Sequence, residues 1–117
     1  MNNVSEKIET LEQAFSAIKA RYTDNEKVRK KFKKWDKPIQ LNFTDTGKHF
    51  QIQINFDQGI DVVEANDPDC EIQVHFDTET LLAILNKELG GVKAYSSGKI
   101  KVDGKITQLL KLKALMF

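Results

Sequence analysis

The feature that most restricts the fold is a strict alternation of apolar and polar side chains in the middle of the chain. Four apolar residues alternate with four polar ones: Phe50, Ile52, Ile54 and Phe56 against Gln51, Gln53, Asn55 and Asp57. Successive side chains of a strand point to opposite faces. The pattern therefore predicts a strand with one face in the core and the other in water. Such a strand belongs to a sheet that other elements cover on its apolar face.

Four further segments have the composition of strands. They lie at residues 39–44, 60–65, 70–76 and 98–104. Asp45-Thr46-Gly47 and Asp57-Gln58-Gly59 are turn sequences between the first three strands. The segment from Ile60 is less regular, because Val62 and Val63 are adjacent. The sequence thus predicts five strands, the last of them bracketed by Gly98 and Gly104.

Apolar stripes predict helices before and after the first four strands. An N-terminal stripe has spacings of four and three, as an amphipathic helix requires: Val4, Ile8, Leu11, Phe15, Ile18 and Tyr22. Thr23 and Glu26 resemble a capping box, which predicts the start of a second helix. That helix is expected to end at Pro38, because the residue before a proline disfavours the helical conformation.

The last forty residues of the chain combine helices with one strand. Asp77 or Thr78 is expected to cap a leucine-rich helix, and Gly90-Gly91 to end it. Residues 92–97 are expected to form a short helical turn, and residues 106–115 a final helix. We therefore predict an α+β fold with the order α-α-β-β-β-β-α-β-α, in which helices cover one face of a five-stranded, mainly antiparallel sheet. No linker or repeat divides the chain, so we expect one domain over residues 1–117.

Composition and the N-terminal sequence indicate where such a chain functions. It is 40% hydrophobic and 30% charged, with a net charge of +1, which is typical of a soluble globular domain. The first ten residues lack the basic and apolar regions of a secretory signal. No apolar run approaches the roughly 20 residues of a membrane span. We expect a cytoplasmic protein whose single cysteine, Cys70, is buried and unreactive.

The apolar faces of these elements either fill an ordinary core or enclose a cavity. An empty cavity costs roughly 24 cal/mol per Å³. A lipid-sized space of about 500 Å³ would then cost about 12 kcal/mol, as much as the whole stability of a small domain. A large cavity must therefore hold a ligand, contain water, or partly collapse when it is empty.

Two stretches of the C-terminal half resemble a known family. They are Phe76-Asp77-Thr78-Glu79-Thr80-Leu81-Leu82 and the segment from Ala94-Tyr95-Ser96-Ser97-Gly98 through Lys99-Ile100-Lys101-Val102-Asp103-Gly104. The second is similar to the pattern of sterol carrier protein 2-like domains, in which a small residue and an aromatic precede a Ser-Gly-Lys-aliphatic-Lys-Val-x-Gly strand. An apolar helix ending near Leu115-Met116-Phe117 follows, as in that family. The resemblance extends over roughly residues 6–117.

The resemblance implies an apolar tunnel between sheet and helices that binds a fatty acid, acyl-CoA, isoprenoid or sterol-like lipid. It brings no catalytic residue and no cofactor. The C-terminal Ala114-Leu115-Met116-Phe117 differs from the Ser-Lys-Leu signal of peroxisomal members. Twelve residues are the predicted lipid-binding lining: Phe56, Val74, Phe76, Leu81, Leu85, Leu89, Tyr95, Ile100, Val102, Leu109, Leu112 and Met116. The sequence alone does not separate lining residues from core residues.

A basic segment before the first strand allows two interpretations. It contains Lys30, Lys31, Lys33 and Lys34 around Phe32 and Trp35. It is either the solvated face of a helix or a surface for transient contact with an anionic membrane, in which the lysines attract headgroups and an aromatic side chain inserts. The N-terminal helical region of the family is similarly linked to membrane contact. No recognition motif accompanies the cluster, so we expect no nucleic-acid partner.

Other patterns do not support catalysis or metal binding. Gly98 to Lys105 lacks the spacing and the Ser or Thr of a phosphate-binding loop. His49 and His75 lie on separate strands without ligands at metal-site spacing. Ser96 and Ser97 have no base nearby in sequence, and no stronger catalytic candidate exists than Tyr95 or His75. We predict a lipid carrier that is not an enzyme. The alternative is an interaction module that accompanies an enzyme or forms a homodimer through the Val4–Tyr22 stripe.

Overall fold

Five strands form one sheet in the order β3-β2-β1-β4-β5. The protein is described from a computed structural model, which places residues 7–55 and 57–117. The strands are β1 (Ile39–Phe43), β2 (His49–Asn55), β3 (Gly59–Glu64), β4 (Ile72–Phe76) and β5 (Lys101–Asp103). Only β1 and β4 pair in parallel, and the other three pairings are antiparallel. The predicted α+β class with a mainly antiparallel sheet is confirmed.

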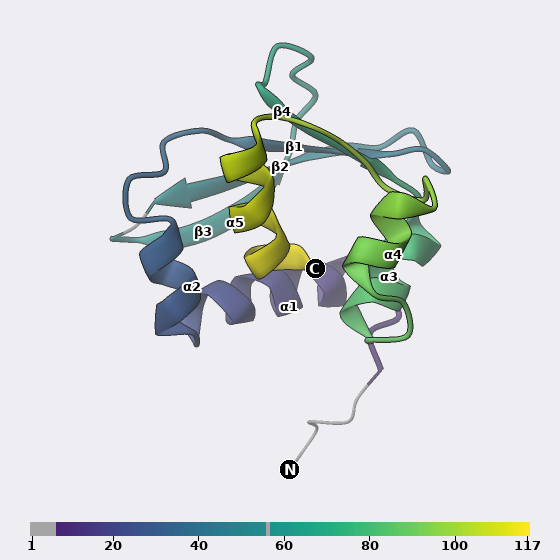
Figure 1. The fold of residues 1–117 in the computed structure, drawn as a ribbon, viewed down its shortest axis with the longest axis horizontal. Coiled ribbons are helices and arrows are strands. Elements are labelled where there is room, and N and C mark those ends of the chain that lie inside the picture. The colour runs from purple at the N-terminus through teal and green to yellow at the C-terminus, as the bar shows by residue number, and fades with distance from the viewer. Residues whose placement is uncertain (1–6, 56) are drawn as a thin grey trace.

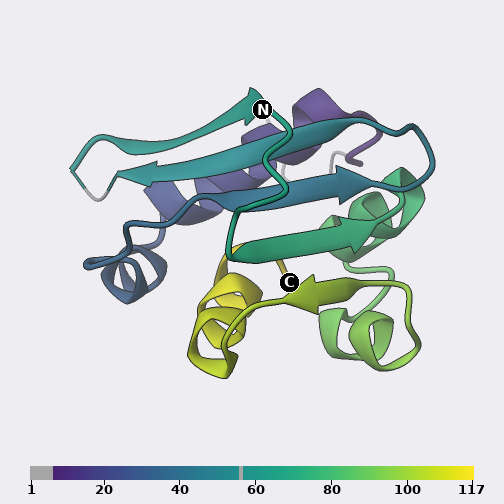
Figure 2. The same ribbon diagram turned by 90° about the horizontal axis from the view of Figure 1, so that it is seen from above.

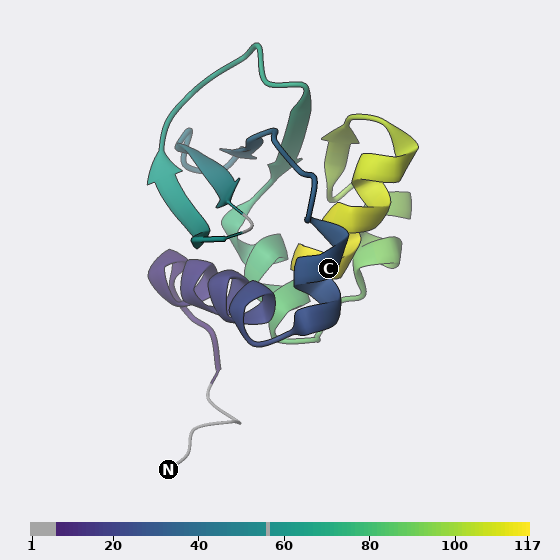
Figure 3. The same cartoon turned by 90° about the vertical axis from the view of Figure 1, so that its left-hand side faces the viewer.

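The helices lie together on one face of the sheet (Figure 1). They are α1 (Leu11–Thr23), α2 (Glu26–Lys31), α3 (Thr78–Leu85), α4 (Gly91–Ser96) and α5 (Ile106–Met116). Seen from the side in Figure 3, α1 and α2 lie beneath the sheet, and α5 lies beside β5. The short helical turn expected at residues 92–97 is α4. Asp77 caps α3 as predicted, because its side chain accepts a hydrogen bond from the backbone N–H of Thr80.

The two N-terminal helices begin and end at other residues than predicted. Thr10 caps α1 in a capping box with Gln13, so the helix starts at Leu11 and Ile8 precedes it. Val4 lies outside the described residues. The capping box assigned to Thr23 is wrong, because Thr23 is the last residue of α1 and the side chain of Asn25 caps α2. The second helix ends at Lys31, well before Pro38.

A connection on the opposite face of the sheet makes the parallel pair possible. From the end of β3, residues 65–71 cross over β2 and β1 to reach β4, as the view from above shows (Figure 2). Gln40 is completely buried beneath this connection. Its amide donates to the carbonyl of Ala65 at 2.8 Å and accepts from the N–H of Asp67 at 3.1 Å. The crossing is thus held by a buried glutamine rather than by apolar contacts.

This connection changes the environment of the predicted polar face. The alternating pattern predicted that Gln51 would face water, but its side chain is buried together with Gln40 and Asn42. The prediction of a sheet exposed on one face is therefore wrong at the centre of the sheet. Buried amides need hydrogen-bond partners, and these side chains supply them to one another: the Gln51 amide donates to Gln40 at 3.3 Å.

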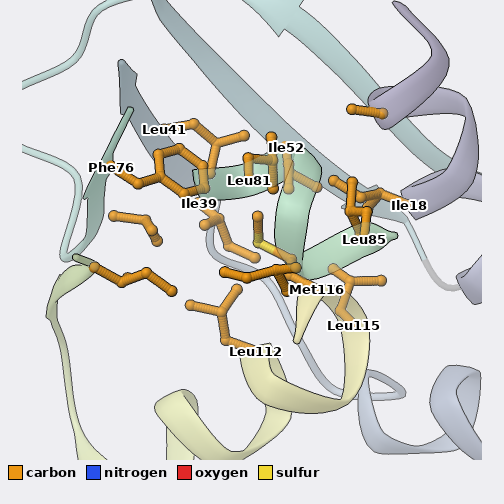
Figure 4. Packing of buried hydrophobic residues seen from close by; sticks show 14 of the residues in the cluster. Ile18, Ile39, Leu41, Ile52, Phe76, Leu81, Leu85, Leu112, Leu115 and Met116 are labelled. Carbon is orange, nitrogen blue, oxygen red and sulfur yellow. The ribbon is translucent and has the colours of Figure 1, made fainter. Parts of the chain in front are cut away.

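The core lies between the sheet and the helices (Figure 4). Leu112, Leu115 and Met116 of α5 meet Ile39 and Phe76 of the sheet there, and all five are at most 1% exposed. The α1 stripe belongs to the same cluster, with Ile18 and Tyr22 covered by the rest of the chain. These two residues thus offer no surface to a second copy, and the structure does not support the homodimer interface expected along the Val4–Tyr22 stripe.

Candidate functional site

An apolar groove lies between α4, β5 and α5 at the β5 edge of the sheet. Its volume is about 250 Å³. In Figure 2 these three elements form the edge of the fold opposite β3. The groove is lined by Gly91, Val92, Tyr95, Ile100, Val102, Ile106, Leu109, Leu110, Leu112, Lys113 and Phe117. Lys113 is the only charged residue in this lining, so the space suits a hydrocarbon rather than a polar molecule.

The lining divides into a buried floor and an exposed rim. We define the floor as Ile100, Val102, Leu109 and Leu112, which are buried or half-buried. The rim consists of Val92, Tyr95, Ile106 and Leu110, whose side chains are 63%, 52%, 74% and 65% exposed. Among the described residues one other large apolar side chain is exposed, Val63 on β3. A contiguous exposed apolar patch marks a binding site, whereas a single exposed valine needs no explanation.

Glycines at the ends of α4 and β5 shape the groove. Gly98, at φ 82°, and Gly104, at φ 151°, allow the chain to turn sharply on both sides of β5. At Gly91, the first residue of α4, a Cβ atom would stand 2.5 Å from the Cβ of Phe117. The absence of a side chain at Gly91 therefore lets the C-terminal residue pack against α4 and close the end of the groove.

A polar contact joins the N-terminal end of α5 to the end of the β3–β4 connection. The side chain of Gln108, which is buried, donates a hydrogen bond to the Glu71 carboxylate. Lys37 forms an ion pair with the same carboxylate at 3.7 Å. The hydrogen bond from Gln108, more than the nearby charges of Lys37 and Lys105, holds the pKa of Glu71 below its ordinary value of 4.5. Glu71 thereby helps to fix the helix that forms one wall of the groove.

This arrangement predicts a specific loss of stability in acid. Because the pKa of Glu71 is lower in the folded than in the unfolded protein, its contribution is complete above pH 4.5 and disappears as the pH falls through the folded value. We expect the Glu71→Gln variant to have a lower urea midpoint than the wild type at neutral pH. The two midpoints should converge as the pH falls below 4.5. A difference between variant and wild type that stayed constant over this range would contradict the assignment.

A second hollow, of about 390 Å³, lies on the outer face of the sheet beside the β3–β4 connection. Asn42 lines this hollow, and both ends of its amide have partners: Oδ1 lies 2.7 Å from Nδ1 of His49, and Nδ2 donates to Gln73 at 3.0 Å. His75 lies 3.8 Å from the Asp103 carboxylate. No group of three or more His, Cys, Asp or Glu side chains suited to a metal occurs in the described part of the chain. These residues form a structural network.

The other reactive candidates also have structural surroundings. Ser96 and Ser97 donate their hydroxyl groups to the carbonyls of Lys93 and Ala94, within the turns of α4. Cys70 lies half-buried in the β3–β4 connection and not at the start of β4. Burial, and then the nearby charges of Asp67 and Asp69, raise the pKa of the Cys70 thiol. A raised pKa keeps this thiol protonated and weakly nucleophilic near neutral pH.

The structure separates the twelve predicted lining residues into two groups. Tyr95, Ile100, Val102, Leu109 and Leu112 border the groove. Six others are not among its lining residues and pack in or against the core: Val74, Phe76, Leu81, Leu85, Leu89 and Met116. Phe56 lies outside the described residues. The prediction did not include Val92, Ile106, Leu110, Lys113 or Phe117; the spacing of Ile106 and Leu110 along α5 was the available signal.

The basic segment does not present its aromatic residues as predicted. Phe32 is completely buried and packs between Tyr22 and Trp35, with ring centroids 6.2 and 5.1 Å away. Trp35 is half-buried, and Lys111 lies 5.8 Å from its ring centroid. Phe32 is thus unavailable for insertion into a membrane, because α2 uses it to pack on α1. Lys30, Lys31, Lys33 and Lys34 are exposed, as a solvated helix face requires.

The chain resembles a known family along most of its length. The SCP-2 sterol transfer family matches residues 15–117, which include all five strands and the whole groove. The chain belongs to this family. The expected membership, which rested on two short stretches of sequence, is confirmed. No curated protein matches the chain significantly by sequence.

Solved structures of SCP-2 proteins share this fold. Palmitated SCP2L2 from Aedes aegypti, determined by solution NMR, matches with a TM-score of 0.72 at 24% identity, over 92% of this chain and 95% of that one. The crystal structure of Sterol Carrier Protein 2 Like 2 from Aedes aegypti matches with a TM-score of 0.65 at 26% identity, over 88% and 93%.

The same fold also occurs within a larger enzyme. The sec-alkylsulfatase Pisa1 from Pseudomonas sp. matches with a TM-score of 0.70 at 19% identity, over 92% of this chain. The chain spans only 16% of the length of that sulfatase. An SCP-2 fold therefore exists both alone and as part of an enzyme.

Within the described residues, no helix combines the length and apolar character that a bilayer span requires.

Proposed function

We propose that this SCP-2 protein binds and carries a lipid with one hydrocarbon chain, without catalysing a reaction on it. The groove supports this most directly, because apolar side chains form both its floor and its rim at the surface of the protein. Transfer of hydrocarbon from water to such a site contributes about 0.8 kcal/mol per buried methylene. The palmitated Aedes protein of the same fold adds support for an acyl chain.

The size of the groove limits the ligand class. Its volume of about 250 Å³ lies just below the range of roughly 300–1,000 Å³ typical of small-molecule sites. A single extended chain suits this space better than a rigid sterol or a lipid with two chains. The groove opens to solvent along its rim, so the polar headgroup remains in water. We therefore favour a fatty acid, or another lipid with a single chain, over a sterol.

Filling the floor of the groove tests this proposal. Leu109→Trp places a larger apolar side chain in the space and introduces no charge. We expect it to weaken binding of palmitic acid at least about tenfold, since tenfold corresponds to about 1.4 kcal/mol, less than the burial of two methylene groups. Isothermal titration calorimetry with palmitic acid measures the change, and Val63→Trp, at the exposed apolar site on β3, is the matched control.

Two outcomes would count against the proposal. Equal affinities of wild type and Leu109→Trp would show that palmitic acid binds elsewhere. If the wild-type protein neither bound palmitic acid nor carried any extractable lipid, and its mass in solution exceeded one chain, the alternative of an interaction module would be favoured. Native mass spectrometry of the purified protein, followed by lipid extraction, reports both the bound lipid and the mass of the protein in solution.

A further inference from the structure

Four of the five large exposed apolar side chains in the described part of the chain gather around the mouth of the groove. Val92 and Tyr95 come from α4, and Ile106 and Leu110 come from α5, one helical turn apart. Between 52% and 74% of each side chain is in contact with solvent. Two separate helices thus present an apolar rim that no described part of the chain covers, and such a patch indicates an interaction surface.

Positive charge is concentrated in the same part of the chain. Residues 90–117 contain six lysines and one acidic residue, Asp103, a net charge of +5. Residues 1–89 contain 12 basic and 16 acidic residues, a net charge of −4. Asp103 is opposite Gln73 in the strand register, and its carboxylate lies 3.8 Å from Nε2 of His75 on the outer face of the sheet. The single acidic side chain of this segment therefore does not face the groove.

Three lysines on or between the elements that form the groove are free to meet an external anion. Lys113 lines the groove beside the rim residues Ile106 and Leu110. Lys93 lies on α4, and Lys99 lies in the turn between α4 and β5. None of these three forms an ion pair with any residue that the structure describes. Exposed apolar side chains bordered by unpaired lysines are the combination that binds the interface of an anionic bilayer.

We propose that the rim of the groove docks on an anionic lipid bilayer, with Ile106 and Leu110 inserted at the interface and Lys113 near the headgroups. In this orientation the groove opens directly toward the acyl chains. A ligand can then pass between bilayer and groove without crossing water, a consequence that rests on the proposed lipid-carrier function. This docking surface differs from the one expected in the basic segment, where Phe32 is buried.

Vesicle co-sedimentation tests the rim directly. The probe is a set of vesicles of phosphatidylcholine with and without phosphatidylglycerol. We expect binding to require phosphatidylglycerol and to weaken with added salt, because lysine–headgroup attraction is screened. Ile106→Ser combined with Leu110→Ser removes two exposed apolar side chains and should weaken binding about tenfold or more. Val63→Ser, the same kind of exchange on β3, should leave vesicle binding unchanged.

The charge of the rim is tested separately. Lys113→Gln should weaken binding to phosphatidylglycerol vesicles about fivefold, the effect of roughly one lysine near an anionic surface. Lys48→Gln, in the turn between β1 and β2, is the matched control and should have no effect. If Lys33→Gln combined with Lys34→Gln reduced binding and the rim variants did not, the contact would lie on the basic segment after α2 and the inference would be overturned.

Palmitic acid binding in solution separates this inference from the proposed function. Leu109→Trp fills the floor and leaves the rim side chains in place, so it should bind phosphatidylglycerol vesicles like wild type while it loses palmitic acid binding. If it lost both, vesicle binding would depend on the ligand site rather than on the rim, and the docking inference would fail. Vesicle binding by the wild-type protein without palmitic acid binding would instead overturn the proposed function and leave the docking intact. A protein that ignored vesicles and dimerised through the rim would overturn the docking.

Discussion

Phe76→Ala is expected to lower the free energy of unfolding by about 3–5 kcal/mol, the usual cost of removing a buried phenylalanine. Phe76 is 1% exposed and stacks on Phe43, with ring centroids 5.0 Å apart and an interplanar angle of 26°. The two residues are also partners in the parallel pairing of β1 and β4. The alanine variant would leave a cavity at the centre of the core. Urea unfolding followed by circular dichroism measures the loss.

Tyr95→Ala is the matched aromatic substitution at the groove. Tyr95 is 52% exposed, so its removal should change the stability by about 0.5 kcal/mol or less, as for most surface substitutions. The sequence alone placed both aromatic residues in the lipid-binding lining, and this pair of variants separates them. If Tyr95→Ala cost as much stability as Phe76→Ala, the division between core and groove would be wrong.

Gly91→Ala is expected to destabilise the protein by about 1–3 kcal/mol through overpacking. The new Cβ atom would lie 2.5 Å from Cβ and 3.4 Å from Cα of Phe117, so the C-terminal residue must move. Helix propensity alone predicts the opposite sign, because alanine is favoured over glycine by about 1 kcal/mol within a helix. A measured loss of stability would therefore report the contact with Phe117. Urea unfolding of the variant provides the measurement.

Gly90→Ala is the control for this prediction. A Cβ atom at Gly90 would meet nothing within 4 Å, and its φ of −71° suits alanine. We expect a change of about 0.5 kcal/mol or less, typical of a surface position. If Gly91→Ala were as well tolerated as Gly90→Ala, Phe117 would not be packed against α4, and the end of the groove would be open.

The alternating segments allowed the sheet to be predicted because their pattern is local. Ile52 and its neighbours have the period of two, and the structure contains the expected strand there. The burial of Gln40 and Gln51 could not be predicted in this way. It depends on the connection that crosses the sheet from β3, which brings the backbone of Ala65 and Asp67 onto the glutamine side chains. The local pattern assigns every polar side chain to the solvent-exposed face, and the burial of a polar side chain becomes evident only from its partners elsewhere in the chain.

The groove was only partly predictable for a similar reason. A leucine or phenylalanine that fills a core cannot be distinguished in sequence from one that lines a site. Leu81 in the core and Leu109 in the groove are examples of the two outcomes. The close approach of Gly91 and Phe117 joins residues far apart in the chain. The exposed Ile106 and Leu110, in contrast, have a spacing of four that places them together on one helix face. Their exposure follows from the packing of α5 through Leu112, Leu115 and Met116.

NMR chemical-shift mapping with palmitic acid tests the central claim, that an acyl chain lies in the groove between α4, β5 and α5. Methyl groups of isoleucine, leucine and valine are labelled, and spectra are recorded as palmitic acid is added. The groove predicts shifts at Ile100, Val102 and Leu109, with Ile60 and Val62 on β3 unchanged. Shifts centred on β3 and α1, or no shifts at saturating palmitic acid, would contradict the account.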